Sequence, residues 1–167
     1  DLLDGKNPRS INMVQIGKAL NDKELDPPIK HLFVWNSDVA NCTPDSSQVR
    51  KGLQRKDLFT VVHDTFWTDS CMYADVVLPA DTQLEHTDLH APYGHYYFSL
   101  TQQAIKPLGE SKSNQDLFRD LAQHMGYKEK CFKETDEGMI KNMIVPKHNP
   151  LFKGVTYEKL KKNGWVK

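Results

Sequence analysis

Two short apolar runs with a helical pattern between them constrain the fold of this chain more than any other feature. Residues 29–35 (IKHLFVW) and 58–62 (LFTVV) are too short for core helices, which predicts two strands buried on both faces. Between them, residues 44–47 (PDSS) supply helix start signals, and Val49 and Leu53 lie four residues apart in a helix that continues to Arg55. Strand, helix and strand form a βαβ unit, whose two strands run parallel.

The other predicted elements continue this alternation. A first helix is expected from Ser10, with apolar residues at 11, 14, 16 and 20 roughly on one face, and the prolines at 27 and 28 end it. We expect a third strand at 75–79, an edge strand or ordered loop at 93–100, and helices at 113–125, 135–144 and 156–162. These elements predict an α/β fold, a three-layer αβα arrangement with a mainly parallel sheet, Rossmann-like or flavodoxin-like.

Length and composition narrow the class of protein. A chain of 167 residues fits one domain, which we expect to have its core at about 9–126 and a helical tail at 127–167. Its 22 basic residues balance 22 acidic ones, which argues against nucleic acid and anionic membranes as partners. No apolar stretch reaches the roughly 20 residues that a membrane helix needs, so no transmembrane segment is expected.

The cysteines and the first residue bear on where such a protein works. Cys42, Cys71 and Cys131 form no C-x-x-C pair, so we expect free thiols rather than a disulfide framework or a zinc ribbon. Free thiols favour a cytoplasmic location, and a periplasmic one would require an upstream export signal. The chain starts at Asp1 rather than Met, so we expect a piece of a longer protein.

Polar segments follow each of the three predicted strands. They are residues 36–38 (NSD), 63–65 (HDT) and 80–82 (ADT). In open parallel sheets, ligands bind outside the carboxyl ends of the strands, so these segments are predicted to meet at one edge and to face a polar ligand. The alternative interpretation is that strand ends are simply polar.

Motifs for other chemistries are missing or incomplete. Neither the G-x-G-x-x-G of nicotinamide enzymes nor the P-loop signature occurs in the sequence. His86 and His90 are four residues apart with His95 near them, which leaves a metal-dependent hydrolase as one alternative, although Pro92 and Gly94 favour a loop there. A stand-alone α/β binding module without a cofactor is the other alternative.

Several motifs occur with an order and spacing that resemble a known family. They are IKHLFVWNSD (29–38), VVHDTFWTDS (61–70), ADVVLP (74–79), LEH (84–86) and KSNQDLFRDLAQHMG (112–126), with a further similarity in the tail, GVTYEKLKKNGWV (154–166). From about Arg9 to Gly126 the chain resembles the molybdopterin oxidoreductases, the dimethyl sulfoxide reductase superfamily. The resemblance implies one of the two α/β domains of the catalytic subunit that grip bis(molybdopterin guanine dinucleotide).

The resemblance also implies, by position, which residues contact this cofactor. They are Asn36, Ser37, Asp38, Cys42, His63, Asp64, His86 and Asn114. Asp38 would accept from guanine N–H groups or ribose hydroxyls, and Asn114 would lie at a helix start beside backbone N–H groups that suit phosphate. The chain departs from the family pattern in the turn 36–39, often Gly-rich, at Met72, commonly basic, and at Asn114, frequently Asp.

What the resemblance implies for the parent enzyme goes beyond this chain. The parent would carry molybdenum or tungsten on the cofactor and perform two-electron or oxygen-atom transfer, and an iron–sulfur cluster would lie outside this chain. No catalytic residue and no metal ligand is implied here, so this chain is not expected to be catalytically competent by itself. Expected partners are the other domains of the same subunit and electron-transfer subunits. Formate, nitrate, sulfur oxyanions, N-oxides and S-oxides all stay open as substrates.

Overall fold

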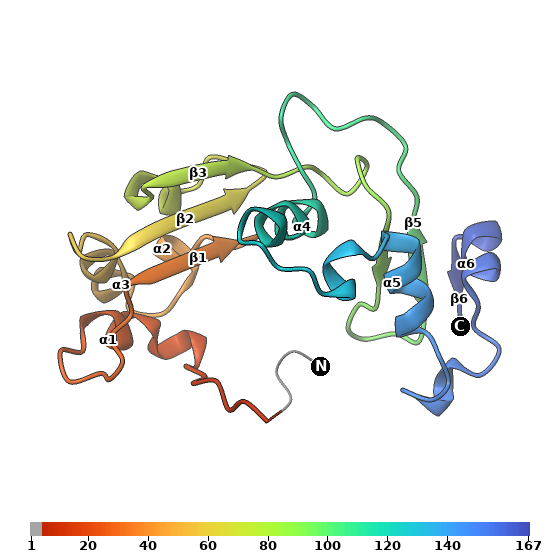
Figure 1. Cartoon of the computed structure of the whole chain (residues 1–167), viewed down its shortest axis with the longest axis horizontal. Coiled ribbons are helices and arrows are strands. Elements are labelled where there is room, and N and C mark those ends of the chain that lie inside the picture. The colour runs from red at the N-terminus through yellow and green to blue at the C-terminus, as the bar shows by residue number, and fades with distance from the viewer. Residues whose placement is uncertain (1–4) are drawn as a thin grey trace. The chain divides into compact units, whose positions relative to one another are not determined.

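The computed structural model describes residues 5–167, which divide into two compact units, one ending at Pro79 and one comprising residues 80–167 (Figure 1). The prediction of a single domain over residues 1–167 stays a prediction, and its first boundary lies outside the described residues.

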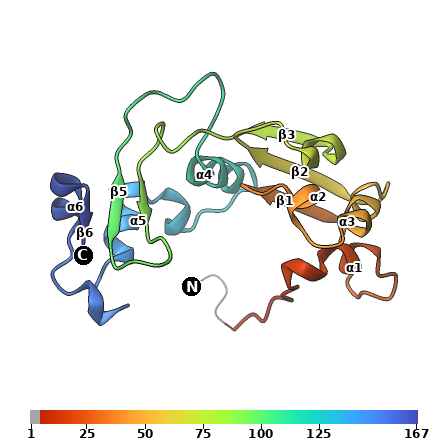
Figure 2. The same cartoon turned by 180° about the vertical axis from the view of Figure 1, so that it is seen from behind.

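The first unit contains a parallel sheet. Its strands are β1 (His31–Trp35), β2 (Phe59–Asp64) and β3 (Val76–Pro79), in the spatial order β1-β2-β3 (Figure 2). His31 pairs with Phe59 and Val61 pairs with Val76, and both ladders are parallel. The prediction of an α/β fold with a parallel sheet is therefore confirmed in this unit.

Helices of the first unit pack on one face of this sheet. They are α1 (Ile16–Asn21), α2 (Val39–Cys42), α3 (Ser46–Leu53) and the 3-10 helix η2 (Asp69–Tyr73). Another 3-10 helix, η1 (Met13–Gln15), precedes α1 and has no buried residue. Buried aliphatic side chains of α1 and α3 form one core cluster, and Val34, Val62 and Cys71 form another. Alternation along the strands directs Leu32 and Val34 to this covered face. The face thus supplies the apolar burial that holds the unit together.

The first helix begins later than predicted. Asn12 rather than Ser10 is the N-cap, and its side chain accepts a hydrogen bond from the backbone nitrogen of Val14. The helical region starts with η1, and the regular helix α1 follows from Ile16. The amide side chain of Asn12 therefore caps the helical region at the residue directly before η1.

The second unit contains an antiparallel sheet that the sequence did not predict. Its strands are β4 (Asp88–His90), β5 (Phe98–Thr101) and β6 (Trp165–Val166), in the order β4-β5-β6. Leu100 of β5, Ile140 and Ile144 of the α5 region, and Tyr157 and Leu160 of α6 form its core. The predicted edge strand at 93–100 corresponds to β5, which lies in the middle of this small sheet.

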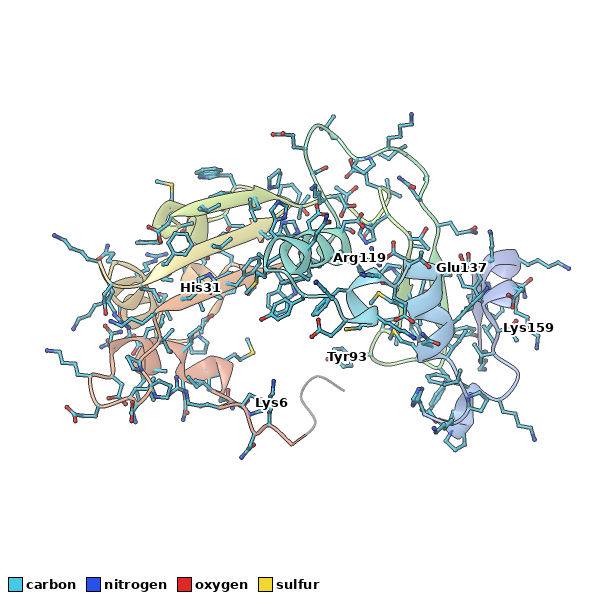
Figure 3. All side chains as sticks on the ribbon, in the orientation of Figure 1. Lys6, His31, Tyr93, Arg119, Glu137 and Lys159 are labelled. Carbon is cyan, nitrogen blue, oxygen red and sulfur yellow. The ribbon has the colours of Figure 1, made fainter. Side chains whose placement is uncertain are left out.

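The helices of the second unit begin where their caps predict. They are α4 (Asn114–His124), α5 (Asp136–Met143) and α6 (Tyr157–Asn163), with 3-10 helices η3 (Lys130–Lys133) and η4 (Pro150–Phe152). Ser113, Thr135 and Thr156 cap the three α-helices through their side-chain oxygens. Arg119 of α4, which Figure 3 labels, donates a hydrogen bond to Asp136 at the start of α5, and this bond joins the two helices. Within residues 5–167, no helix has the length and apolar character needed to span a membrane.

Candidate functional site at the carboxyl edge of the parallel sheet

Strand β1 ends in a sharp turn that is joined to the end of strand β2. The backbone nitrogen of Asn36 donates to the carbonyl oxygen of His63 at 3.2 Å. Asn36 has φ +50°, a left-handed conformation that asparagine tolerates better than most residues. Asn36 and Ser37 are exposed. The first two of the three predicted polar segments therefore do meet at the carboxyl edge of the sheet.

The next residue of this turn, Asp38, is held by Ser70. Oδ1 of Asp38 accepts hydrogen bonds from the backbone nitrogen of Ser70 at 3.1 Å and from its hydroxyl at 2.7 Å. The carbonyl oxygen of Asp38 accepts from the backbone nitrogens of Asn41 at 3.2 Å and Cys42 at 2.8 Å, which starts α2. Cys42 is exposed at the end of this short helix and forms no disulfide. Asp38 thus joins the turn to both α2 and η2.

The side chain of His63 in β2 is buried rather than exposed to solvent. It is 0% exposed, and Nδ1 is 3.2 Å from the carbonyl oxygen of Leu78 in β3. Because a carbonyl oxygen can only accept, Nδ1 carries the ring proton and donates it to β3. The observed contact of the His63 ring therefore joins β2 to β3.

Asp64 and the two aromatic residues after it form a turn at the end of β2. Oδ1 of Asp64 accepts from the backbone nitrogen of Phe66 at 3.0 Å, as in an Asx-turn. This bond directs the chain away from the sheet, and the side chains of Phe66 and Trp67 are 76% and 70% exposed. The polar segment after β2 thus begins with a hydrogen-bonded turn, which presents the half-buried carboxylate of Asp64 and two exposed aromatic rings at the carboxyl edge of the sheet.

In the second unit, His86 lies beside a buried carboxylate. Its Nδ1 is 2.9 Å from Oδ1 of Asp81, and its Nε2 is 4.0 Å from Oδ2 of Asp88. Burial raises the pKa of the Asp81 carboxyl above its ordinary value, and the charge and hydrogen bond of His86 oppose that rise. Asp81 and His86 therefore form a largely buried pair of polar side chains in this unit.

A second buried carboxylate fastens the loop before α4. Oε2 of Glu85 accepts from the backbone nitrogen of Thr82 at 2.7 Å, and Oε1 accepts from the backbone nitrogen of Leu108 at 2.7 Å. These hydrogen bonds lower the pKa of Glu85. Glu85 thereby fixes the segment that carries Asp81 and His86 against the loop that leads to Ser113.

Asn114 is the first residue of α4. Ser113 caps the helix by accepting from the backbone nitrogen of Asp116 at 3.1 Å. The side-chain oxygen Oδ1 of Asn114 is inaccessible to solvent and has no hydrogen-bond partner among the described residues. An unpartnered buried amide oxygen is costly, and at a helix start it lies beside the N–H groups that favour anions.

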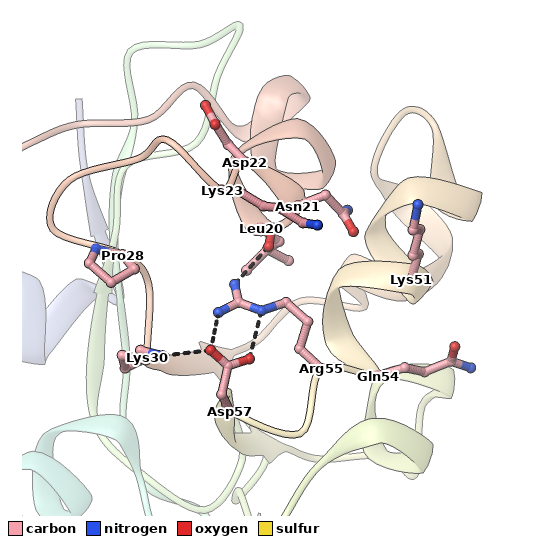
Figure 4. Close-up of a pocket in the computed structure, with 10 residues that line it drawn as sticks. All are labelled: Leu20, Asn21, Asp22, Lys23, Pro28, Lys30, Lys51, Gln54, Arg55 and Asp57. Atoms are coloured by element: carbon pink, nitrogen blue, oxygen red, sulfur yellow. Dashed lines mark hydrogen bonds and ion pairs between the residues drawn. The ribbon is translucent and has the colours of Figure 1, made fainter.

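The opposite, amino edge of the parallel sheet carries a pocket of about 670 Å³ (Figure 4). Its floor is an ion-paired group in which Asp57 accepts from Arg55 at 2.9 and 3.0 Å and from Lys30 at 2.5 Å. Hydrogen bonds from Arg55 and Lys30 hold the pKa of Asp57 well below its ordinary value. No local sequence pattern predicts this pocket, because its walls come from residues up to 37 positions apart, Leu20 to Asp57.

The structure gives no support to the metal-dependent hydrolase alternative. His90 lies in β4 rather than on a helix with His86, so the two do not share a helix face. Over residues 5–167, no group of three or more His, Cys, Asp or Glu side chains is arranged to hold a metal ion.

Sequence reasoning missed two residues that organise these sites. Ser70 lies 32 positions after Asp38, and no local pattern marks their contact. Glu85 lies within the LEH motif, next to the predicted His86, and a signal for it was therefore present: an acidic residue in an otherwise loop-like segment, close to a predicted ligand.

The fold, the carboxyl edge of the parallel sheet and the sequence motifs together define a class of protein. A family model described as molybdopterin oxidoreductase matches residues 8–124. The chain belongs to the molybdopterin oxidoreductase family, and the resemblance seen in its motifs is confirmed.

Particular relatives agree with this assignment. The chain is 44% identical over all 167 residues to the probable oxidoreductase YoaE of Bacillus subtilis, and covers 24% of that protein. It is 32% identical over 136 residues, 81% of its length, to the F420-dependent formate dehydrogenase subunit alpha of Methanocaldococcus jannaschii, of which it covers 20%. Its fold matches acetylene hydratase from Pelobacter acetylenicus with a TM-score of 0.71 and 27% identity, over 93% of this chain and 20% of that one. The chain thus spans about a quarter or less of these proteins.

Proposed function

We propose that this chain is the part of a molybdenum- or tungsten-dependent oxidoreductase that holds one molybdopterin guanine dinucleotide, at the carboxyl edge of the parallel sheet. The observation that carries the proposal is the family match over residues 8–124, which includes all three strands of that sheet and the start of α4. The parallel topology supports it, because ligands of open parallel sheets bind at this edge.

The residues at this edge suit a nucleotide. Asn36 and Ser37 are exposed, and they supply amide and hydroxyl groups that both donate and accept hydrogen bonds. Asp64 supplies a carboxylate, which accepts from guanine N–H groups. In the second unit, His86 and Asn114 are proposed cofactor contacts by position, and the buried Oδ1 of Asn114, which has no partner among the described residues, fits a group that receives a donor from a bound ligand.

In the proposed function, this chain binds and orients, and other parts of the protein perform the reaction. When bound, the molybdenum or tungsten pterin supplies the two-electron or oxygen-atom transfer chemistry. Asn36, Ser37 and Asp64 fix the nucleotide end, and Cys42 lies at the end of α2, the helix that follows this turn. The parent protein is proposed to contain further domains of the same subunit, to exchange electrons with partner subunits, and to carry any iron–sulfur cluster outside this chain.

The test is the metal and nucleotide content of the full-length protein. The protein is purified under anaerobic conditions, molybdenum and tungsten are measured by elemental analysis, and GMP is measured after acid hydrolysis. The expected result is a stoichiometric content of one of the two metals, together with GMP released from the guanine dinucleotide. A full-length protein that holds neither metal and releases no GMP would refute the proposal.

A further inference from the structure

Ser70 occupies a buried position from which it makes three hydrogen bonds to the turn after β1. It is 1% exposed and lies in η2, which follows the Asp64 turn. Its backbone nitrogen and its hydroxyl both donate to Oδ1 of Asp38, and its hydroxyl oxygen accepts from the backbone nitrogen of Ala40 at 3.1 Å. The hydroxyl therefore donates to the side chain of Asp38 and accepts from the backbone of Ala40 in α2.

These bonds account for both lone pairs of one carboxylate oxygen. Oδ1 of Asp38 accepts two hydrogen bonds from Ser70, so this oxygen has no capacity left for a nucleotide. The expectation that Asp38 contacts guanine or ribose therefore depends on its other oxygen, Oδ2, which Asp38→Asn replaces with an amide group. The exposed groups of the turn are instead those of Asn36 and Ser37.

The turn needs an external restraint. It consists of Asn36, in the sparsely populated left-handed region, followed by Ser37 and then by the four-residue helix α2, which is too short to be stable by itself. Thr43 and Ala40 are buried nearby, and Ser70 supplies the hydrogen bonds that hold the Asp38 side chain. If the turn samples other conformations, the apparent affinity for a ligand falls in proportion to the fraction of molecules that hold the binding-competent conformation.

We infer that Ser70 is a positioning residue for the nucleotide-binding turn 36–38, and that Asp38 acts as the acceptor of this clamp rather than as a ligand of the nucleotide base. The inference rests on the proposed function and deepens it, because it divides the residues of that edge into those that touch the cofactor and those that hold them in place. Ser70 acts through Asp38 and Ala40, and does not itself contact the cofactor.

The test compares variants of the full-length protein by cofactor-derived GMP per protein, by the rate of cofactor loss, and by Tm of the cofactor-free form. Ser70→Ala removes one bond to Asp38 and leaves the Ala40 nitrogen without its acceptor, so cofactor loss should be about five- to tenfold faster. Ser70→Thr keeps the hydroxyl and should restore retention. Lys51→Ala, at an exposed position of α3, lies outside the clamp and should retain the cofactor as the parent does.

Asp38→Asn separates the two roles of Asp38. Its amide oxygen still accepts from Ser70, so a clamp predicts cofactor retention within about twofold of the parent, whereas Asp38→Ala should lose the cofactor as Ser70→Ala does. Loss of cofactor in Asp38→Asn with an unchanged Tm would show that the negative charge touches the nucleotide, and would overturn the inference. Unchanged cofactor loss in Ser70→Ala would also overturn it. Failure of the proposed function is distinguishable, because the parent protein itself would then release no GMP.

Discussion

Arg55 donates two hydrogen bonds to the carboxylate of Asp57, from Nε at 3.0 Å and from Nη2 at 2.9 Å. The same guanidinium donates to the carbonyl oxygen of Leu20 at the end of α1, at 2.7 Å, and to that of Ile29 before β1, at 3.2 Å. One side chain therefore joins the end of α1, the start of β1 and the segment between α3 and β2 (Figure 4).

This arrangement predicts that Arg55→Lys is destabilising although it keeps the charge. A lysine has no planar fork and cannot reproduce these four contacts, so we expect a loss of about 2 kcal/mol in the free energy of unfolding. Chemical denaturation of the cofactor-free full-length protein measures it, with the exposed neighbour Gln54→Ala as the control. Equal stability of Arg55→Lys and the parent would contradict the role assigned to the guanidinium.

The contact between α1 and α3 predicts a second effect. A Cβ atom placed on Gly52 would lie 2.5 Å from Cβ of Leu20, a distance that real side chains do not reach. Gly52→Ala should therefore destabilise the protein by about 1–3 kcal/mol, although alanine is the better helix former. Lys51→Ala, at the exposed preceding position of α3, should change the stability by less than about 0.5 kcal/mol. A stabilised Gly52→Ala variant would mean that the two helices separate easily.

Asn114 predicts opposite effects on stability and on cofactor binding. Its buried Oδ1 has no partner among the described residues, so Asn114→Ala removes an unsatisfied group and should leave the unfolding free energy of the cofactor-free protein unchanged or raise it by up to about 1 kcal/mol. Retention of the cofactor should fall. GMP release and thermal unfolding, each compared with Gln123→Ala in the same helix, measure the two effects. A variant that unfolds more easily and retains its cofactor would assign Asn114 to the fold alone.

Glu85 predicts a dependence of stability on acid. Hydrogen bonds from Thr82 and Leu108 lower its pKa in the folded state below the ordinary value of 4.5. The folded state therefore binds fewer protons than the unfolded state in the window below pH 4.5, and this part of the stability is present above that pH and is lost as the pH falls through the folded-state pKa.

Glu85→Gln tests this dependence. The variant should have a lower Tm at neutral pH, because an amide N–H₂ group would face a backbone donor, and its Tm should fall less steeply than that of the parent below pH 4.5. Thermal unfolding at a series of pH values gives both curves. Because the charge of Glu85 contributes to the raised pKa of Asp81, the same comparison is repeated with Asp81→Asn in both proteins, and parallel curves there would argue against the assigned role.

The sequence predicted those parts of the fold that depend on local signals. Capping residues placed the starts of α4, α5 and α6, since the hydroxyls of Ser113, Thr135 and Thr156 bond within three residues. Apolar runs placed β1, β2 and β3 to within two or three residues. The antiparallel sheet escaped prediction, because its strands are two to four residues long and Phe98 pairs with the distant Val166.

The same distinction holds for the candidate site. The segments at the strand ends were predictable, because a parallel sheet brings the ends of its strands to one edge. The state of each side chain was not predictable. His63 follows an apolar run and is predicted as a ligand by position, yet its ring is buried against Leu78, and the two oxygens of Glu85 and the clamp of Ser70 on Asp38 depend on contacts 3 to 32 residues apart.

The central claim is that the carboxyl edge of the parallel sheet holds a guanine nucleotide, and an experimental structure of the metal-containing full-length protein tests it most directly. We predict nucleotide atoms within about 3.2 Å of polar atoms of Asn36, Ser37 or Asp64, the ordinary hydrogen-bond range. A nucleotide bound elsewhere in that structure, with solvent against these three residues, would contradict the claim.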